Sequence, residues 1–467
     1  MLPLLLILIP FLTAVIILFI KNEKSLITFA FFASCITLVI SISTICNPNI
    51  LNYTYPWIPS FGSNFSLHLD GLSKMLCLLN AIALPIILLS IFKNKQNHNS
   101  NFLALLFFMQ VGMMGVFLAS DALLFYFFWE LALIPAYFLC SIWGGEKRIQ
   151  VTIKFFIYTF VGSLLMLIGL IYLYLQTKGN HSFDIAEFYN LSLSSKQQNS
   201  IFALLFIAFA IKMPIFPLHT WQPDTYEQSP TPVTMLLSGV MVKMGLYAVL
   251  RWIVPIVPNG VHTHSHFIII LSVIGMLYAS LIAIKQDDIK RLVAYSSIAH
   301  IGLMCASIFT NNNIALNGML IQMFNHGINV IGLWIAADVI EKQFNTRKFS
   351  ELGGLAQKAP TFAILFVIIA LANIALPLTN AFVGEFLMFT GLFEFNIWIA
   401  AIAGISIILA AVYTLNMVQK IFYGNTVSQT EHAIDITWNV KISLFVIVIL
   451  IIVLGVYPMP LINLIAH

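Results

Sequence analysis

Long apolar runs separated by short polar connections dominate the chain. Runs of about 20 residues, the length that an α-helix needs to cross a bilayer, recur from one end to the other. The fourteen runs lie at about 2–20, 25–46, 72–92, 101–119, 121–143, 154–176, 201–221, 232–252, 264–284, 289–309, 314–338, 361–395 (interrupted), 398–422 and 440–460. This pattern predicts an all-α polytopic membrane protein of about 14 transmembrane helices, with residues 1–467 in a single transmembrane bundle.

Two of the expected spans are interrupted by proline. The seventh contains Pro214 and Pro217, and the twelfth contains Pro377. These spans lie five apart, and an odd offset reverses the orientation in the membrane. We therefore expect spans 4–8 (101–252) and spans 9–13 (264–422) to form two inverted five-helix repeats, each with a broken helix. Matched broken helices in two halves indicate a transport site near the middle of the membrane, although two unrelated proline kinks remain an alternative.

Two connections are long enough to carry structure of their own. Residues 47–70 alternate in polarity and are rich in Tyr, Trp and Pro, which predicts a short hairpin or a cover at the membrane interface. Residues 183–191, "FDIAEFYNL", have the pattern of a short amphipathic helix that lies on the membrane surface.

The composition agrees with a membrane protein and excludes an ordinary soluble domain. Hydrophobic residues make up 60% of the chain and charged residues only 9%, whereas a soluble domain carries roughly 25% charged residues. We expect the chain to be surrounded by the lipid bilayer and to bind no nucleic acid. The run at 2–20 has no basic region before it and no small-residue cleavage site, which favours a retained first helix over a signal peptide.

Lysine and arginine are unequally distributed between the two sides of the expected bundle. Sixteen lie in connections on one side and four on the other. The first side holds Lys21, Lys24, Lys93, Lys95, Lys147, Arg148, Lys154, Lys285, Lys290, Arg291, Lys342, Arg347, Lys348, Lys358, Lys420 and Lys441, and the second holds Lys74, Lys178, Lys196 and Arg251. Because positive residues accumulate in cytoplasmic loops, we expect the first side in the cytoplasm and both termini outside.

Cysteine spacing and glycine-rich motifs give no reason to expect a cofactor in this chain. The five cysteines are Cys35, Cys46, Cys77, Cys140 and Cys305, and none are in CxxC spacing. This argues against iron–sulfur clusters, zinc and a disulfide framework. Neither a GxGxxG nor a Walker A motif is present, so we expect no bound nucleotide either.

Four charged residues fall well inside the expected spans: Glu130, Lys212, Lys243 and Glu385. A charge at the centre of a membrane helix costs roughly 2.5–3.5 kcal/mol on the insertion scale. Structural salt bridges between helices are one explanation. The alternative is a proton path, in which Lys212 is a proton-carrying station and the neighbouring prolines open the helix to water and backbone dipoles.

Polar side chains at helical spacing accompany these charges. Gln322, His326 and Asn329 follow an i, i+4, i+7 pattern, so they share one helix face. In "AYSSIAH", two serines lie one turn before His300. Histidine exchanges protons near neutral pH, and hydroxyl and amide groups order water between such stations. Together with the buried charges, these groups favour a proton path over packing roles.

Several long motifs resemble the antiporter-like subunits of respiratory complex I, the proton-translocating NADH-quinone oxidoreductase. They are "FAIKMPIFPLHTWQPDTYEQSPTPVTMLLSGVMVKMGLYAVLRW", "WELALIPAYFLCSIWGG", "KFFIYTFVGSLLMLIG", "AYSSIAHIGL" and "FVGEF". The likeness covers nearly the whole chain. It implies a fourteen-helix fold with inverted five-helix repeats, proton pumping driven remotely by quinone reduction in other subunits, and sister antiporter-like subunits as neighbours in a bacterial inner membrane, with the mitochondrial inner membrane less favoured.

The resemblance also implies roles for individual residues. Glu130 corresponds to the glutamate of the fifth span and is the partner of Lys212, the lysine of the broken seventh span. The family's connecting lysine, relay histidines and terminal glutamate match Lys243, His300, His326 and Glu385.

The residue at the end of this path distinguishes branches of the family. Sister subunits and multisubunit cation/proton antiporters typically carry lysine where this chain has Glu385, and the subunit M branch carries glutamate. The chain departs from the family pattern at Leu378 and Asn380, where the family usually has glycines. This departure puts in doubt the flexibility of the break after Pro377 in the twelfth span. A cation/proton antiporter subunit and a membrane-bound hydrogenase subunit remain the alternatives.

Overall fold

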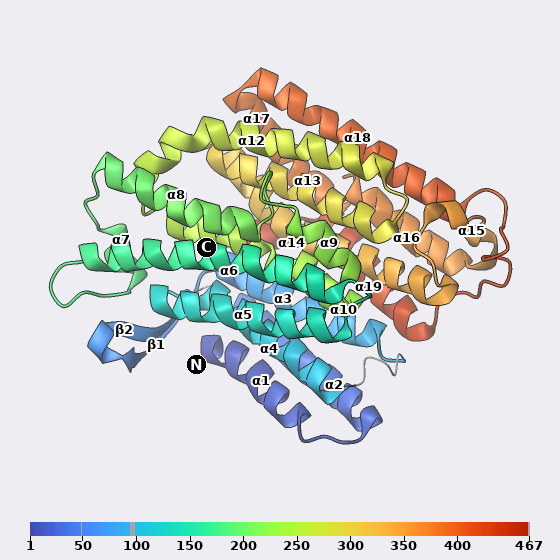
Figure 1. Ribbon diagram of the computed structural model, residues 1–467, viewed down its shortest axis with the longest axis horizontal. Helices are drawn as coiled ribbons and strands as arrows, with labels where there is room; N and C mark the ends of the chain where they lie inside the picture. The colour runs from blue at the N-terminus through green and yellow to red at the C-terminus, as the bar shows by residue number, and fades with distance from the viewer. Residues whose placement is uncertain (48, 94–98, 466–467) are drawn as a thin grey trace.

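The computed structural model describes residues 1–47, 49–93 and 99–465, and most of them are helical. Among these residues, eleven helices are long and apolar enough to cross a membrane. They are α2 (Glu23–Ile45), α3 (Gly71–Ser90), α4 (Ser100–Leu118), α5 (Ala122–Trp143), α6 (Arg148–Gln176), the composite span Thr231–Ile253, α12 (Pro258–Lys285), α13 (Ile289–Phe309), α14 (Asn313–Phe344), α18 (Ile397–Phe422) and α19 (Trp438–Val456). The long helices run side by side in one bundle (Figure 1).

The other three expected spans are shorter or divided helices. The first is α1 (Leu2–Ile17). The seventh and the twelfth are each broken in two, as the prolines predicted: α8 (Ser195–Lys212) is followed by α9 (Trp221–Gln228), and α16 (Pro360–Asn373) by α17 (Asn380–Phe395). The fourteen-span prediction is thus confirmed, whereas the assignment of 101–252 and 264–422 as inverted repeats stays a prediction.

Several helices extend beyond the apolar runs that predicted them. For example, α6 begins at Arg148 instead of residue 154, and α14 continues to Phe344 instead of ending at residue 338. Hydropathy identifies only the part of a helix that lies in hydrocarbon, whereas backbone hydrogen bonding continues into the polar connection. The expected cytoplasmic connection at 93–100 lies mainly outside the described residues.

A β-hairpin covers one end of the bundle, which confirms the prediction for residues 47–70. Strands β1 (Leu51–Ile58) and β2 (Ser63–Leu69) pair antiparallel. The carboxylate of Asp121, at the start of α5, accepts hydrogen bonds from Ser63 Oγ and Asn64 N, each at 2.9 Å, and so fixes the hairpin to the bundle. The surface helix α7 (Ile185–Tyr189) lies at the same end (Figure 1) and is shorter than the predicted 183–191.

Short helical elements lie near the opposite end of the bundle and at the end of the chain. Near the opposite end are η5 (Phe349–Glu351) and α15 (Leu355–Lys358), and α20 (Met459–Ile465) follows α19. The last span is fixed to the third. Asn439 Nδ2, near the start of α19, donates to the carbonyl oxygens of Leu89 at 3.1 Å and Ser90 at 3.0 Å, at the end of α3.

The centre of the bundle is made by the eighth, tenth and eleventh spans. The composite eighth span consists of α10 (Thr231–Leu236), η3 (Leu237–Met241), α11 (Lys243–Ala248) and η4 (Val249–Ile253), and η3 and η4 are π-helical. This span, α13 and α14 are buried almost all round, whereas α2, α6 and α18 leave most of their surface exposed. The polar residues of the central helices therefore face protein and not lipid.

Two glycines bring the eighth span and α14 into close approach. A Cβ atom on Gly327 of α14 would lie 2.8 Å from the carbonyl oxygen of Gly239, and one on Gly239 would lie 2.9 Å from Ile331 Cδ1. Because no other residue fits at this distance, the glycines set the separation between the helices that carry Lys243 and His326.

Candidate functional site

Lys243 lies at the centre of the bundle with a fully buried side chain. Its Nζ donates to the carbonyl oxygen of Ser238 at 2.6 Å and lies 2.9 Å from Nδ1 of His326. The π-helical turn η3 contains Ser238, and a π-turn alters the usual backbone pairing and occurs often at functional sites. Since an ammonium group only donates, a charged Lys243 requires His326 Nδ1 to be the acceptor.

The row of titratable groups continues from His326 to Glu385. The rings of His326 and His300 have centroids 5.4 Å apart. His300 Nδ1 lies 3.0 Å from Oε1 of Glu385, and the side chains of these two residues are only 9% and 10% exposed. Lys243, His326, His300 and Glu385 thus form a continuous row across α11, α14, α13 and α17.

The predicted polar face of α14 is confirmed, and each of its members reaches a different part of the site. Gln322 Nε2 donates to Glu385 Oε1 at 3.2 Å, and Asn329 Nδ2 donates to Oδ1 of Asn380 at 3.0 Å. His326 lies between them and contacts Lys243. This face of α14 therefore joins the central lysine to the break in the twelfth span, where α17 begins.

The break in the twelfth span forms without glycine. Ala375 and Leu378 adopt φ angles of 53° and 74°, in the left-handed region that side chains other than glycine rarely occupy. The Leu378 side chain is 71% exposed, but its backbone packs against α19, where a Cβ atom on Gly455 would lie 2.3 Å from the Leu378 carbonyl oxygen. The sequence departure at Leu378 has not removed the break.

A small cavity of about 20 Å³ lies beside His300 and Glu385, with Ser280 and Tyr413 also in its lining. That volume holds about one water molecule. In the described part of the chain, His300 Nε2 and Ser280 Oγ have no protein hydrogen-bond partner. The cavity therefore gives room for a water molecule beside Nε2 of His300 and Oγ of Ser280.

Lys212 is the last residue of α8 and is only 2% exposed. Its Nζ lies 5.1 Å from the ring centroid of Trp129, which is adjacent to Glu130 on α5. Within the described residues, neither Lys212 Nζ nor Glu130 Oε1 has a hydrogen-bond partner. Glu130 and Lys212 therefore make no hydrogen bond through these atoms, and the ammonium group lies over the indole ring in a cation–π contact.

Sequence reasoning missed two residues at the seventh-span break. His219 is 3% exposed, and its Nδ1 has no partner in the described part of the chain. Trp221 Nε1 donates to the carbonyl oxygen of Ile211 at 2.9 Å and so spans the break. Both lie in the motif that contains Lys212, but only the folded break shows what they contact.

A buried polar cluster beside the row was found only in part, because the sequence singled out the serines before His300 and not their partners. Ser296 Oγ accepts hydrogen bonds from Tyr413 Oη at 3.0 Å and from Asn373 Nδ2 at 3.1 Å. Tyr413 lies within an otherwise apolar run, and no motif marked it. In the described ranges, no group of three or more His, Cys, Asp or Glu side chains could hold a metal ion.

Comparison with known proteins gives the chain a family. The model of the family described as "NADH:quinone oxidoreductase/Mrp antiporter, TM" matches residues 119–411. NADH-quinone oxidoreductase subunit M of Rickettsia prowazekii is 34% identical over 452 residues, which cover 95% of this chain and 91% of that protein. The chain belongs to this family.

Solved structures of other proteins agree with this chain in fold. A chain of respiratory complex I from Thermus thermophilus with bound NADH superposes with a TM-score of 0.92 at 27% identity, covering 100% of this chain and 98% of that one. A chain of the Mrp complex from Dietzia sp. gives a TM-score of 0.89 at 20% identity, covering 99% and 95%. At that identity, the second likeness shows the fold alone.

Proposed function

We propose that this chain translocates protons across the bacterial inner membrane as an antiporter-like subunit M of NADH-quinone oxidoreductase, through the buried row of titratable groups. The observation that carries the relay is the unbroken sequence of contacts from Lys243 through His326 and His300 to Glu385. Each of these groups can hold and release a proton, and the row lies inside the bundle, away from lipid.

The contact between Lys243 and His326 favours a single proton shared between them. Two positive charges 4 Å apart repel by about 4 kcal/mol at an effective dielectric constant of 20, and these nitrogens are only 2.9 Å apart. When His326 receives a proton, Lys243 becomes neutral. The proton then passes to His300 and on to Glu385, whose carboxylate stabilises a charged His300 at 3.0 Å.

Lys212 and Glu130 are the groups that supply protons to the row. In the arrangement described, the Lys212 ammonium group lies over the Trp129 ring and makes no hydrogen bond to Glu130. Bringing the two charges to 4 Å would favour the protonated lysine by about 4 kcal/mol at a dielectric constant of 20. Carrying one charge across the membrane against 100 mV takes about 2.3 kcal/mol. Bringing Lys212 and Glu130 together and separating them again can therefore drive one proton across the membrane.

Oxidation of NADH and reduction of quinone take place in other subunits, and this chain contributes no redox centre of its own. Its neighbours are other membrane-arm subunits. Glu130 supports such a neighbour, because it is half-buried in mid-span and adjacent to exposed Phe127 and Ile134 on α5. A carboxylate that faces lipid is costly, and a sister subunit over this face of α5 removes that cost.

The first test is to replace Lys212 and Glu130. In Lys212→Ala and Glu130→Ala complexes, we expect quinone-coupled proton pumping to fall by tenfold or more, because the groups that supply protons to the row are lost. Oxidation of NADH by a soluble acceptor should persist in both, since that chemistry is elsewhere. The measurement is acidification of inverted membrane vesicles on addition of NADH, with assembly checked on native gels.

The matched control is Lys196→Ala, which removes an exposed lysine near the start of α8 and should pump normally. Pumping at the wild-type rate in both Lys212→Ala and Glu130→Ala complexes would exclude the relay.

A further inference from the structure

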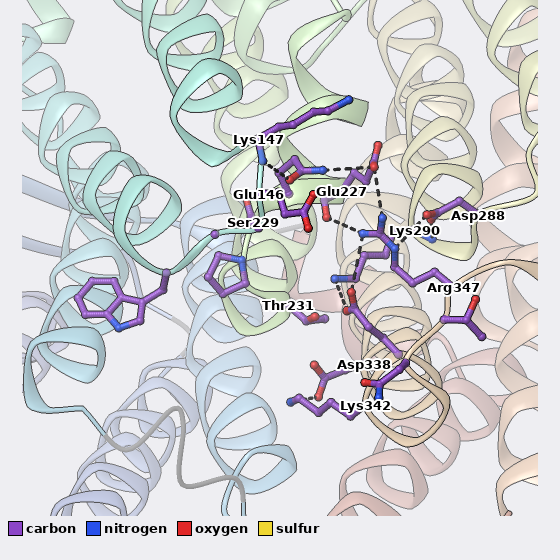
Figure 2. Close-up of a pocket in the computed structure, with 18 of the residues that line it drawn as sticks. Glu146, Lys147, Glu227, Ser229, Thr231, Asp288, Lys290, Asp338, Lys342 and Arg347 are labelled. Atoms are coloured by element: carbon purple, nitrogen blue, oxygen red, sulfur yellow. Dashed lines mark hydrogen bonds and ion pairs between the residues drawn. The ribbon is translucent and has the colours of Figure 1, made fainter. Parts of the chain in front are cut away.

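A cluster of ion pairs lies at the end of the bundle away from the β-hairpin, outside the proton row. It borders a hollow of about 800 Å³ whose lining is mainly charged. Glu227 and Arg347 are directly bonded to each other in the lining of this hollow, with Asp288 and Lys290 nearby (Figure 2). The pairs connect α9 of the broken seventh span with residues that come much later in the chain.

The half-helix α9 is bonded to the backbone beside Lys212. Trp221, its first residue, donates from Nε1 to the carbonyl oxygen of Ile211, the residue before Lys212. With only eight residues, α9 is too short to be stable alone. Its position is therefore set by its neighbours, and any change in the backbone at Lys212 is passed to it through Trp221.

Two carboxylates on one face of α9 are held from opposite sides. Asp224 and Glu227 are three residues apart and so lie on the same face. On one side, Lys154 Nζ of α6 lies 2.9 Å from Asp224. On the other side, Nη1 of Arg291, on α13, lies 2.7 Å from Oε2 of Glu227 and 3.3 Å from Oδ1 of Asp224. The half-helix is thus bound between a helix of the expected first repeat and a helix of the second.

Arg347 completes this contact. It lies 3.3 Å from the Glu227 carboxylate and donates to the Glu227 carbonyl oxygen at 3.0 Å. Its Nε also lies 3.0 Å from Asp288, whose carboxylate caps α13 by accepting from the backbone N–H groups of Lys290 and Arg291. We name Glu227, Arg291 and Arg347 the Glu227 clamp.

The clamp holds the helix that carries His300. Arg291 and His300 are both on α13, nine residues apart, and a helix transmits a displacement along its axis over that distance of roughly 14 Å. His300 in turn contacts Glu385 at 3.0 Å. A continuous mechanical connection therefore runs from the Lys212 break through α9 and Arg291 to the far end of the proton row.

We propose that the Glu227 clamp is a coupling device, in which Glu227 is a positioning residue that transmits movement at the Lys212 break to α13 and so to the His300–Glu385 contact. The proposal rests on the proposed function, because it needs Lys212 and His300 to act in one proton path. It adds a second, mechanical connection between the two ends of that path, beside the proton row through Lys243.

The test is the number of protons translocated per NADH oxidised in vesicles that contain the whole complex. For Glu227→Gln, which keeps the shape and removes the charge, we expect this ratio to fall below half of the wild-type value per assembled complex. Glu227→Asp keeps the charge on a shorter side chain and should give an intermediate ratio. Glu146→Gln, in the lining of the same hollow, removes a carboxylate that makes no ion pair with the described residues and should leave the ratio unchanged.

A double-mutant cycle separates coupling from simple stabilisation. If Glu227 acts through Arg291, the Glu227→Gln, Arg291→Gln double variant should have a ratio no lower than the worse single variant, because both remove one contact. A wild-type ratio in assembled Glu227→Gln, additive losses in the double variant, or failure of both Glu227 variants to assemble would each overturn the proposal. If Lys212→Ala abolishes pumping while Glu227→Gln pumps normally, the relay stands and only the coupling role is lost.

Discussion

At the scale of single residues, the proposed proton row ends at Glu385. Its carboxylate receives the side-chain hydrogen bond of Gln322 and contacts His300, so two elements define its position. The adjacent cavity of about 20 Å³ gives it access to one water molecule. A group that accepts a proton from His300 and releases it to water has to be ionisable, which makes the chemical identity of this side chain decisive.

Replacing Glu385 tests this directly. Glu385→Gln keeps the shape but cannot ionise, and we expect it to block pumping about as severely as Lys212→Ala. Glu385→Asp and Glu385→Lys restore a titratable group and should each keep part of the activity. The measurement is NADH-driven proton uptake by inverted vesicles, with assembly checked on native gels. If the glutamine variant assembles and pumps normally, Glu385 is a packing residue and the exit lies elsewhere.

The residues also show what the sequence could and could not predict. The buried charges and the polar face of α14 were found because charge in an apolar run and i, i+4, i+7 spacing are properties of the sequence alone. The contact between Lys212 and Trp129 was missed, because side-chain rotation and packing decide which neighbour an ammonium group meets. Tyr413 and the Glu227 clamp were missed because their partners lie far away in the chain.

At the scale of helices, the approach of α14 to the eighth span fixes the Lys243–His326 contact. The helix periodicity and the proline breaks were predictable, because they follow from backbone geometry and residue type. The π-helical turn η3 was not, because nothing in its composition differs from an ordinary apolar helix. The glycine pair Gly239 and Gly327 explains how the two backbones come so close at this turn.

Gly327→Ala tests the importance of this separation. The added Cβ would lie 2.8 Å from the Gly239 carbonyl oxygen and from the Leu79 side chain. Overpacking of this kind typically costs about 1–3 kcal/mol, and a shift of α14 would lengthen the 2.9 Å contact of Lys243 with His326. We expect a lower thermal unfolding midpoint of the purified complex and reduced pumping.

Gly404→Ala is the matched control, because a Cβ at Gly404 has nothing within 4 Å. Its unfolding midpoint should be no lower than that of the wild type, because alanine favours a helix over glycine, and its pumping should be unchanged. An unchanged midpoint and rate in Gly327→Ala would show that α14 tolerates the larger separation.

At the scale of the whole molecule, the two ends of the bundle differ in chemistry. The β-hairpin and α7 cover one end, and the charged hollow beside α9 lies at the other. The unequal distribution of Lys and Arg over the connections, sixteen against four, predicts that the charged hollow faces the cytoplasm. Protons would then be taken up on the side that carries the hollow and released on the side of the hairpin.

Reporter fusions test this orientation. Fusions in 144–153, 285–291 and 341–360 should report a cytoplasmic location, as should one in 93–100, and fusions at both termini should report an external one. The expectation follows from the even number of spans and from the positions of Lys and Arg. A C-terminal fusion that is active in the cytoplasm would contradict the fourteen-span arrangement.

The hydrogen bonds from Asn439 to the end of α3 have a consequence for biogenesis. The carbonyl groups of Leu89 and Ser90 are paired by a residue 350 and 349 positions later in the chain. At a synthesis rate of roughly 5–20 residues per second, Asn439 emerges from the ribosome tens of seconds after α3. Until α19 is synthesised, these carbonyl groups in the last turn of α3 lack their protein donor and depend on water for a hydrogen bond. A chain that stops before the last span therefore leaves two backbone acceptors at the end of an early helix without their protein donor.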